Sequence, residues 1–229
     1  MPLKLSVIVP AYNEVATIET LLKRVLDVGL DLEVVVVDDG STDGTLEGLK
    51  AFEHDPRVVV VAHESNGGKG RAIRTGIAHV TGDVVLIQDA DLEYDPGDYE
   101  AILREFDDPE VSVVYGSRRL MKSNPMSSLS FFLGGVTLTW ITNALYGTGI
   151  TDEPTCYKAF RSELLKELPL KCEGFEFCPE VTAMVAKRGI RIREVPIHYY
   201  PRLKSEGKKI RARHWFEAVG TLLAHRFSR

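Results

Sequence analysis

The 229-residue sequence has only three cysteines, Cys156, Cys172 and Cys178, and their spacing fits no zinc or redox signature. An odd count without such a signature argues against a disulfide-stapled fold and is typical of free thiols in a reducing compartment. A long apolar N-terminal run is also lacking, because residues 5–9 are followed by Pro10, and we expect no signal peptide. With 44% hydrophobic and 27% charged residues, the composition is that of a globular domain rather than a disordered or fibrous chain.

Charge is absent from one stretch and concentrated in another. Residues 123–151 contain no charged side chain, and their apolar residues recur at helical spacing among Ser, Thr and Gly. This stretch is too polar for a typical spanning helix, and we expect a helix that lies at a membrane interface or is buried against protein. From residue 202 onward, eight basic and two acidic residues give about +6 in a chain of net charge −5. Such an end indicates an anionic ligand or surface rather than nucleic acid, unless it is only a solvated face.

Short apolar runs rich in β-branched residues alternate with helical patterns along the first half. We expect strands at 5–9, 34–37, 58–62, 84–87 and 111–115, and helices near 15–28, 45–52, 69–79 and 97–106. This alternation predicts an α/β fold with a mostly parallel central sheet that helices cover on both sides. After residue 118 the alternation fades, and we expect a helix in the uncharged stretch, strands near 155–160 and 190–195, and a helix near 176–187.

Polar clusters follow four of the predicted strands, at residues 10–14, 38–41, 89–91 and 116–118. Ligands of parallel sheets bind beyond the carboxyl ends of the strands, so we expect the clusters to meet at one edge. Asp89 and Asp91 project to the same side of an extended segment, and Glu93 continues that side. Their oxygens suit Mg²⁺ or Mn²⁺, although a turn or a helix cap would also use such acids.

Asp39 ends the second predicted strand and can accept hydrogen bonds from a nucleobase or ribose, whereas residues 41–45 favour a turn and a helix start. Residues 10–14 occupy the place where a dinucleotide-binding glycine motif would stand. Residues 66–70 resemble a phosphate loop in composition but lack its spacing. We expect them to cap a helix, with Lys69 either near phosphates or solvated.

Taken together, residues 10–14, 37–41, 89–91 and 116–118 resemble the family 2 inverting glycosyltransferases of the GT-A fold. The resemblance is closer to the group that contains dolichol-phosphate mannose synthase and polyprenyl-phosphate glycosyltransferases. It covers most of the chain and is most specific up to Arg118. It implies one GT-A domain over residues 1–229, with the donor and metal half at 1–118 and the acceptor half at 119–229.

The resemblance also implies roles for individual residues. The nucleoside would be held by Pro10, Tyr12, Glu14, Val37 and Asp39; the metal by Asp89, Asp91 and Glu93; the donor by Ala90; and phosphates by Arg118, Arg202 and Lys209, less surely Lys208. Glu93 occupies a position often filled by Gln in relatives. Relatives often carry an Arg at the start of the helix after Arg118, and residues 124–127 contain none. Some have C-terminal membrane spans that this sequence lacks, so we expect a peripheral enzyme or one with a membrane partner.

The implied reaction is transfer of a hexose, with inversion, from a nucleotide-sugar of the GDP-mannose or UDP-glucose type to a polyprenyl or dolichyl phosphate. It would depend on Mg²⁺ or Mn²⁺, with Asp89, Asp91 and Arg118 as catalytic residues, at the cytoplasmic face of a membrane. A phosphate acceptor is already ionised and needs cations rather than a general base. The alternative is a soluble or protein-linked hydroxyl acceptor, for which Asp152 or Glu153 could serve as base. A non-catalytic nucleotide-sugar sensor is disfavoured by the intact acids and Arg118.

Overall fold

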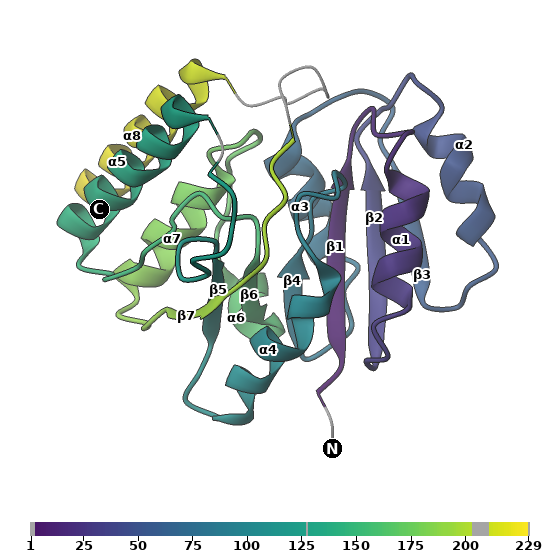
Figure 1. Cartoon of the computed structure of the whole chain (residues 1–229), viewed down its shortest axis with the longest axis horizontal. Coiled ribbons are helices and arrows are strands. Elements are labelled where there is room, and N and C mark those ends of the chain that lie inside the picture. The colour runs from purple at the N-terminus through teal and green to yellow at the C-terminus, as the bar shows by residue number, and fades with distance from the viewer. Residues whose placement is uncertain (1–2, 127, 203–210, 229) are drawn as a thin grey trace.

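A computed structural model describes residues 3–126, 128–202 and 211–228, and its centre is a seven-stranded sheet (Figure 1). The strand order is β3-β2-β1-β4-β6-β5-β7. The strands are β1 (Leu5–Ala11), β2 (Leu32–Asp38), β3 (Val58–Ala62), β4 (Val84–Ile87), β5 (Val113–Ser117), β6 (Lys158–Arg161) and β7 (Arg193–Pro196). The prediction of an α/β fold with a mostly parallel sheet is confirmed, since only the pairs that involve β6 are antiparallel among these strands.

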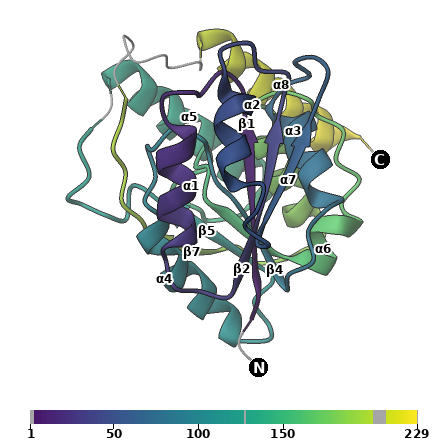
Figure 2. The same ribbon diagram turned by 90° about the vertical axis from the view of Figure 1, so that its right-hand side faces the viewer.

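Helices lie on both sides of this sheet, as predicted (Figure 2). In that view α1 and α4 lie on one side and α3 and α6 on the other. The α-helices are α1 (Ile18–Leu26), α2 (Thr45–Leu49), α3 (Lys69–Ile77), α4 (Tyr99–Arg104), α5 (Leu129–Tyr146), α6 (Ser162–Glu167), α7 (Phe177–Lys187) and α8 (Ala212–Phe227). Short 3-10 turns at Lys50–Phe52, Pro96–Asp98 and Glu105–Asp107 flank α2 and α4, so the predicted helices at 45–52 and 97–106 are each divided.

β6 is inserted between two strands from the first half of the chain. It pairs antiparallel with β4 and with β5, so that Ala159 lies opposite both Leu86 and Val114. β7 then extends the sheet beyond β5 in the parallel direction. The sheet therefore takes strands from both sides of residue 118, and β4 and β5 are not direct neighbours.

β3 departs from the expectation that all first-half strands are buried on both faces. It forms the edge of the sheet and pairs only with β2 among the named strands, and Val59 is 40% exposed. Nearly all residues of β1, β2 and β4 are buried. An apolar run alone does not distinguish an edge strand from a central one, which explains the difference.

The C-terminal end is a 16-residue helix, α8, which the sequence had indicated only as a basic segment. α8 packs against both α5 and α7, and the contact buries Ala218 and Leu222 with Leu138 of α5 and Ala183 of α7. In Figure 1 α5 and α8 run side by side in the same direction and form a layer beside α7, with Trp215 Nε1 donating to the Gly134 carbonyl (3.1 Å) near the start of both helices. The packed face of α8 has Trp215, Ala218, Val219 and Leu222 at three- and four-residue spacing, whereas Phe216, Leu223 and Phe227 are exposed.

α5 is the uncharged 18-residue helix, and it ends at Gly147 in a left-handed conformation (φ 66°). Its length and its mean hydropathy of 1.2 would allow it to cross a membrane, and 17% of this window is buried in the protein. Leu138, Thr139 and Thr142 make up its buried side. The exposed apolar residues of α5, Leu129, Phe132, Leu133 and Trp140, are available to contact something outside the chain.

Candidate active site

Arg202 links two of the predicted polar positions, Glu14 and Asp91, at the carboxyl edge of the sheet. Its Nη1 and Nη2 atoms donate hydrogen bonds to Glu14 Oε2 (3.1 Å) and Oε1 (3.2 Å), and Nη2 also donates to Asp91 Oδ2 (2.9 Å). Glu14 follows β1 and Asp91 follows β4, whereas Arg202 comes after β7. The expected convergence of strand ends on one edge is therefore present for these residues, and one guanidinium group links them.

Glu93, predicted as a third metal ligand, also faces Arg202, but through the main chain. Glu93 Oε1 accepts the Arg202 backbone N–H (2.7 Å), and Oε2 accepts the Tyr199 hydroxyl (3.0 Å). The Glu93 side chain is 7% exposed. In this arrangement Glu93 anchors the segment that carries Arg202, and a role as metal ligand would require it to leave these donors.

The carboxylates of Asp89, Asp91 and Glu93 form an acidic group, and their combined negative charge is the main evidence that a cation fits there. Burial, and then the charges of Asp89 and Glu93, raise the pKa of Asp91 to about 7, against the opposing effect of Arg202. In the described part of the chain, no three His, Cys, Asp or Glu side chains are grouped closely enough to hold a metal ion as they stand. The carboxylate oxygens of Asp89 and Asp91 are the ligand type that Mg²⁺ and Mn²⁺ prefer, so these two residues fit the ion and Glu93 fits less well.

Lys69 is the cation that faces Asp89. Its ammonium group donates a hydrogen bond to Asp89 Oδ1 from the first residue of α3, and it lies 3.8 Å from the Cys156 sulfur. Lys69 is 15% exposed at the side chain and Asp89 24% exposed, so solvent reaches the pair. The sequence had left Lys69 between a phosphate-side role and a solvated one, and it is placed at the acidic site.

Asp39 is nearly buried and organises the loop before α3. Its carboxylate accepts the backbone N–H groups of Gly67 (3.0 Å) and Gly68 (2.7 Å), and lies 2.7 Å from His63 Nδ1. Gly40 next to it has φ 72°, and a Cβ there would lie 2.6 Å from the Ser65 carbonyl carbon. The close approach of these two loops therefore requires glycine at residue 40.

The other predicted donor contacts vary in accessibility. Pro10 and Tyr12 are half-buried at the end of β1, whereas Val37 is fully buried in the core and can meet a ligand only through its main chain. Ala90 is 4% exposed, and its carbonyl accepts the Thr17 hydroxyl (2.7 Å). The nucleoside-binding roles of these residues and of Asp39 stay predictions. Lys209 and Lys208 lie outside the described residues.

Arg118 forms a bidentate ion pair with Asp152 at the end of β5. Arg118 Nε and Nη2 each donate to an Asp152 oxygen at 2.7 Å, and the Arg118 backbone N–H also donates to Asp152 (3.0 Å). The guanidinium carbon lies 5.0 Å from the centre of the Tyr199 ring. Burial opposes ionisation of Asp152, but Arg118 outweighs it and lowers the Asp152 pKa.

Neither carboxylate suggested as a general base is accessible to an acceptor. Asp152 is 1% exposed and holds Arg118. The Glu153 carboxylate is fully buried; the Thr182 hydroxyl donates to its Oε1 (3.5 Å), and its Oε2 has no hydrogen-bond partner among the described residues. Burial raises the Glu153 pKa. Removal of a proton from an acceptor hydroxyl by either residue would first require the protein around it to open.

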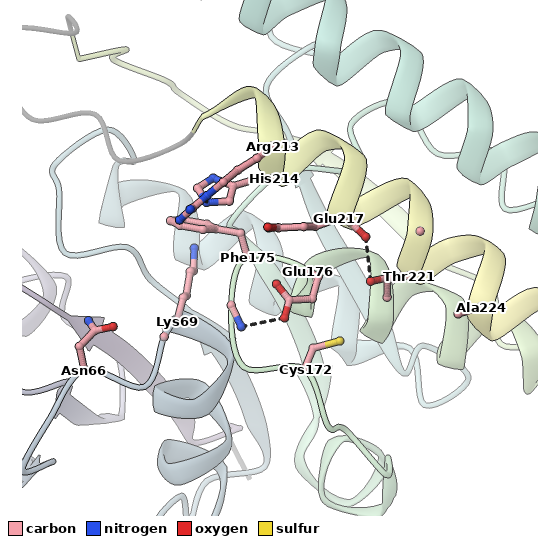
Figure 3. Close-up of a pocket in the computed structure, with 13 residues that line it drawn as sticks. Asn66, Lys69, Cys172, Phe175, Glu176, Arg213, His214, Glu217, Thr221 and Ala224 are labelled. Atoms are coloured by element: carbon pink, nitrogen blue, oxygen red, sulfur yellow. Dashed lines mark hydrogen bonds between the residues drawn. The ribbon is translucent and has the colours of Figure 1, made fainter.

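An open cavity of about 690 Å³ lies beside Lys69, between the start of α3, the loop before α7 and α8, which lines it from Arg213 to Ala224 (Figure 3). Phe175 lies between Lys69 and His214: the Lys69 nitrogen is 6.0 Å from the centre of the Phe175 ring, and the Phe175 and His214 ring centres are 4.7 Å apart. Glu176 and Glu217 line the same cavity. Its size suits a sugar-sized or larger ligand.

Several residues of this site were missed from the sequence. Tyr199, His63 and the α8 residues Arg213 and His214 had no signal in spacing, because each comes to the site through tertiary packing. The sequence suggested Asp152 as a base, whereas the structure pairs it with Arg118.

Comparisons with known proteins agree with this geometry. The chain matches the profile of glycosyl transferase family 2 over residues 6–168. It is 30% identical to a UDP-N-acetylglucosamine--dolichyl-phosphate N-acetylglucosaminyltransferase from Methanococcus voltae, with 83% of each chain covered. It is 29% identical to the dolichyl-phosphate beta-glucosyltransferase ALG5A from Trichomonas vaginalis over 85% of this chain, although it spans only 65% of that relative.

Among solved structures, glucosyl-3-phosphoglycerate synthase from Mycobacterium tuberculosis, crystallised with Mn²⁺, UDP and phosphoglyceric acid, superposes with a TM-score of 0.77. The superposition covers 99% of this chain and 80% of that one at 22% identity, and it shows a shared GT-A fold. A sheet edge that gathers acids and cations, together with a family match over most of the chain, makes this protein an enzyme that transfers sugars: it belongs to glycosyl transferase family 2.

Proposed function

We propose that this enzyme transfers a hexose or an N-acetylhexosamine from a nucleoside diphosphate donor to a polyprenyl phosphate of the dolichyl type, with inversion and with Mg²⁺ or Mn²⁺. One observation carries the choice of acceptor. Asp152 and Glu153, the carboxylates suggested as bases, are buried, and Asp152 is paired with Arg118, while Lys69, Arg118 and Arg202 gather at the same edge. A phosphate nucleophile needs no base, and cations reduce its repulsion from the donor diphosphate.

The names of the relatives support this acceptor. The Methanococcus voltae and Trichomonas vaginalis proteins are both named for transfer to dolichyl phosphate, with N-acetylglucosamine and glucose as the respective sugars. The donor in this chain therefore stands among UDP-N-acetylglucosamine, UDP-glucose and GDP-mannose. One sheet with strands from residues 1–118 and 119–229 supports a single catalytic domain.

Asp89 and Asp91 would hold the divalent ion, which supplies a Lewis acid for the departing diphosphate. Arg202 already bridges Glu14 and Asp91, so its guanidinium is placed to meet phosphate oxygens beside them. Lys69 orients the Asp89 carboxylate. Asp39 fixes the glycine turn at residues 67–68, which fixes the start of α3 and thus Lys69.

We also propose that the enzyme works at the cytoplasmic face of a membrane as a peripheral protein. Exposed apolar side chains on α5 and α8, such as Leu133, Trp140 and Phe216, form one part of the contact surface. Arg211 and Arg213 at the start of α8 add positive charge. An apolar helix with neighbouring basic residues supplies the two signals that stable peripheral binding needs.

A hydroxyl acceptor is the second candidate, and one observation favours it. Glu176 and Glu217 line the cavity beside Lys69. A carboxylate in that position could remove a proton from a soluble acceptor, without the burial that restrains Asp152 and Glu153.

The deciding experiment is a panel assay of nucleoside diphosphate release. Purified enzyme with Mn²⁺ is incubated with each of the three donors, with and without a polyprenyl phosphate in detergent. We expect one donor to be cleaved, with release that needs both metal and lipid. Release that needs metal but ignores the lipid would replace the proposed acceptor by a hydroxyl compound, and Glu176→Gln would then be the base variant to test.

A further inference from the structure

Arg119 occupies a defined position between the active-site edge and the first turns of α5. Its Nη1 donates to the Thr151 carbonyl (2.8 Å), and its guanidinium carbon lies 5.7 Å from the centre of the Phe132 ring. Its Nη2 would lie 3.0 Å from a Cβ on Gly135, so the glycine makes room for it. Asn124 fixes the preceding loop by donating to the Arg118 and Ile197 carbonyls (2.8 Å each).

Among the described residues, Arg119 has no carboxylate within ion-pair distance. Arg118 and Arg119 are adjacent, but the nearby Asp152 gives both of its oxygens to Arg118. Glu194 accepts the backbone N–H groups of Thr151 and Asp152 instead. Across the described ranges, Arg119 takes part in no salt bridge. Burial lowers the Arg119 pKa, the charge of Asp152 opposes this effect, and Arg118 adds to it. An anion at this point would favour the charged guanidinium.

The surroundings of Arg119 are apolar on the side of α5. Leu129, Phe132 and Leu133 lie three and four residues apart, so they share one face of the helix, and they are 61%, 39% and 50% exposed. The stretch at 123–151 has no charged side chain of its own. Phe132 therefore joins the Arg119 guanidinium to this apolar face, and Arg118, which pairs with Asp152, is the preceding residue.

We propose that Arg119 binds the phosphate group of the acceptor and that the stripe of Leu129, Phe132 and Leu133 holds the first part of its apolar chain. The ligand class is a phosphate monoester with a prenyl chain. This assignment rests on the proposed function and adds to it a specific residue and a direction of approach. Thr151 orients the guanidinium, and Phe132 covers one of its faces.

The test compares Arg119→Gln, Arg119→Lys and the control Lys122→Gln, which removes one exposed charge from the same loop. The KM for farnesyl phosphate is measured by diphosphate release, and its Kd is measured separately by calorimetry without donor. Loss of one charge-assisted contact is expected to raise both constants about tenfold or more in Arg119→Gln. Arg119→Lys should recover most of the affinity, and the donor KM and Lys122→Gln should stay within about twofold of wild type.

Inorganic phosphate and 3-phosphoglycerate serve as soluble probes in the same calorimetric assay. We expect both to bind at least about tenfold more weakly than farnesyl phosphate, and Phe132→Ala to weaken only farnesyl phosphate. Equal binding of all three probes would overturn the apolar stripe, and an unchanged Kd in a folded Arg119→Gln variant would overturn the site.

The two proposals fail separately. If the wild-type enzyme cleaves a donor only with lipid phosphate while Arg119→Gln leaves the lipid KM unchanged, the site is wrong and the reaction stands. If no lipid phosphate promotes cleavage but farnesyl phosphate binds in an Arg119-dependent way, the reaction is wrong and the site stands.

Discussion

The ammonium group of Lys69, at the first residue of α3, is hydrogen-bonded to the carboxylate of Asp89, two residues beyond the end of β4. Without Lys69, the Asp89 carboxylate loses its counter-charge while Asp91 and Glu93 remain nearby. We expect Lys69→Met to lower kcat/KM for the donor about 100-fold, which corresponds to roughly 3 kcal/mol. Lys69→Arg keeps the charge and should retain more activity. Wild-type kcat/KM in a folded Lys69→Met variant would show that the Lys69–Asp89 pair has no role in catalysis.

Asp89→Ala should abolish transfer and leave the fold intact. Removal of the Asp89 carboxylate relieves its repulsion with Asp91 but leaves Lys69 without its partner, and because these effects oppose each other the Tm should change by no more than about 5 °C. The measurements are diphosphate release and calorimetric binding of Mn²⁺ in the presence of UDP. Asp107→Ala, at an exposed acid away from the site, is the matched control. Full activity in Asp89→Ala would end the assignment of Asp89.

The Arg118–Asp152 pair separates stability from catalysis. Asp152→Asn leaves a guanidinium group without its buried counter-charge and should destabilise the protein by about 3–5 kcal/mol, which denaturant unfolding measures. The double variant Arg118→Met with Asp152→Leu removes both charges and should regain most of that stability. If Arg118 also meets a phosphate, the double variant stays inactive; recovery of activity along with stability would make the pair purely structural.

Glu33 predicts how stability depends on pH. Burial opposes its ionisation, but hydrogen bonds from Lys4, Ser6 and Thr81 outweigh burial and lower the Glu33 pKa to about 2. Because the folded pKa lies below the unfolded value, the stabilisation is fully present above about pH 4.5 and is lost as the pH falls towards 2. Glu33→Gln should cost about 2 kcal/mol at pH 7 and much less near pH 2. An equal loss at both pH values would contradict this.

Membrane contact gives a test that does not need substrate. We expect the protein to sediment with anionic liposomes at low salt and to be released as the ionic strength rises to about 0.5 M, where the Debye length is short. Leu133→Asp on α5 should weaken sedimentation. Val59→Asp places the same charge on the exposed face of β3 and should leave it unchanged. Failure of the wild type to sediment at low salt would remove the peripheral placement.

The sequence predicted those features that depend on residues close together in the chain. The bounds of β3 and β4 coincide with the predicted runs at 58–62 and 84–87, and the acids Asp89 and Asp91 follow β4 as expected. The antiparallel insertion of β6 could not be predicted, because four residues such as Lys158–Arg161 carry no signal of direction or neighbour. The same holds for the partners of the site residues: that Arg202 reaches Glu14, 188 positions away in sequence, depends on how the sheet brings strand ends together.

The position of β6 has a consequence for synthesis on the ribosome. β4 ends at Ile87, whereas β6, which pairs with it, ends at Arg161. At translation rates of about 5–20 residues per second, the intervening chain takes roughly 4–15 s to be made. Until β6 is made, one edge of β4, and one edge of β5 once that strand has been made, have no partner strand. An open strand edge promotes pairing with other chains. A nascent chain stalled before residue 158 is therefore expected to need a chaperone, whereas one released after β6 can close its own sheet.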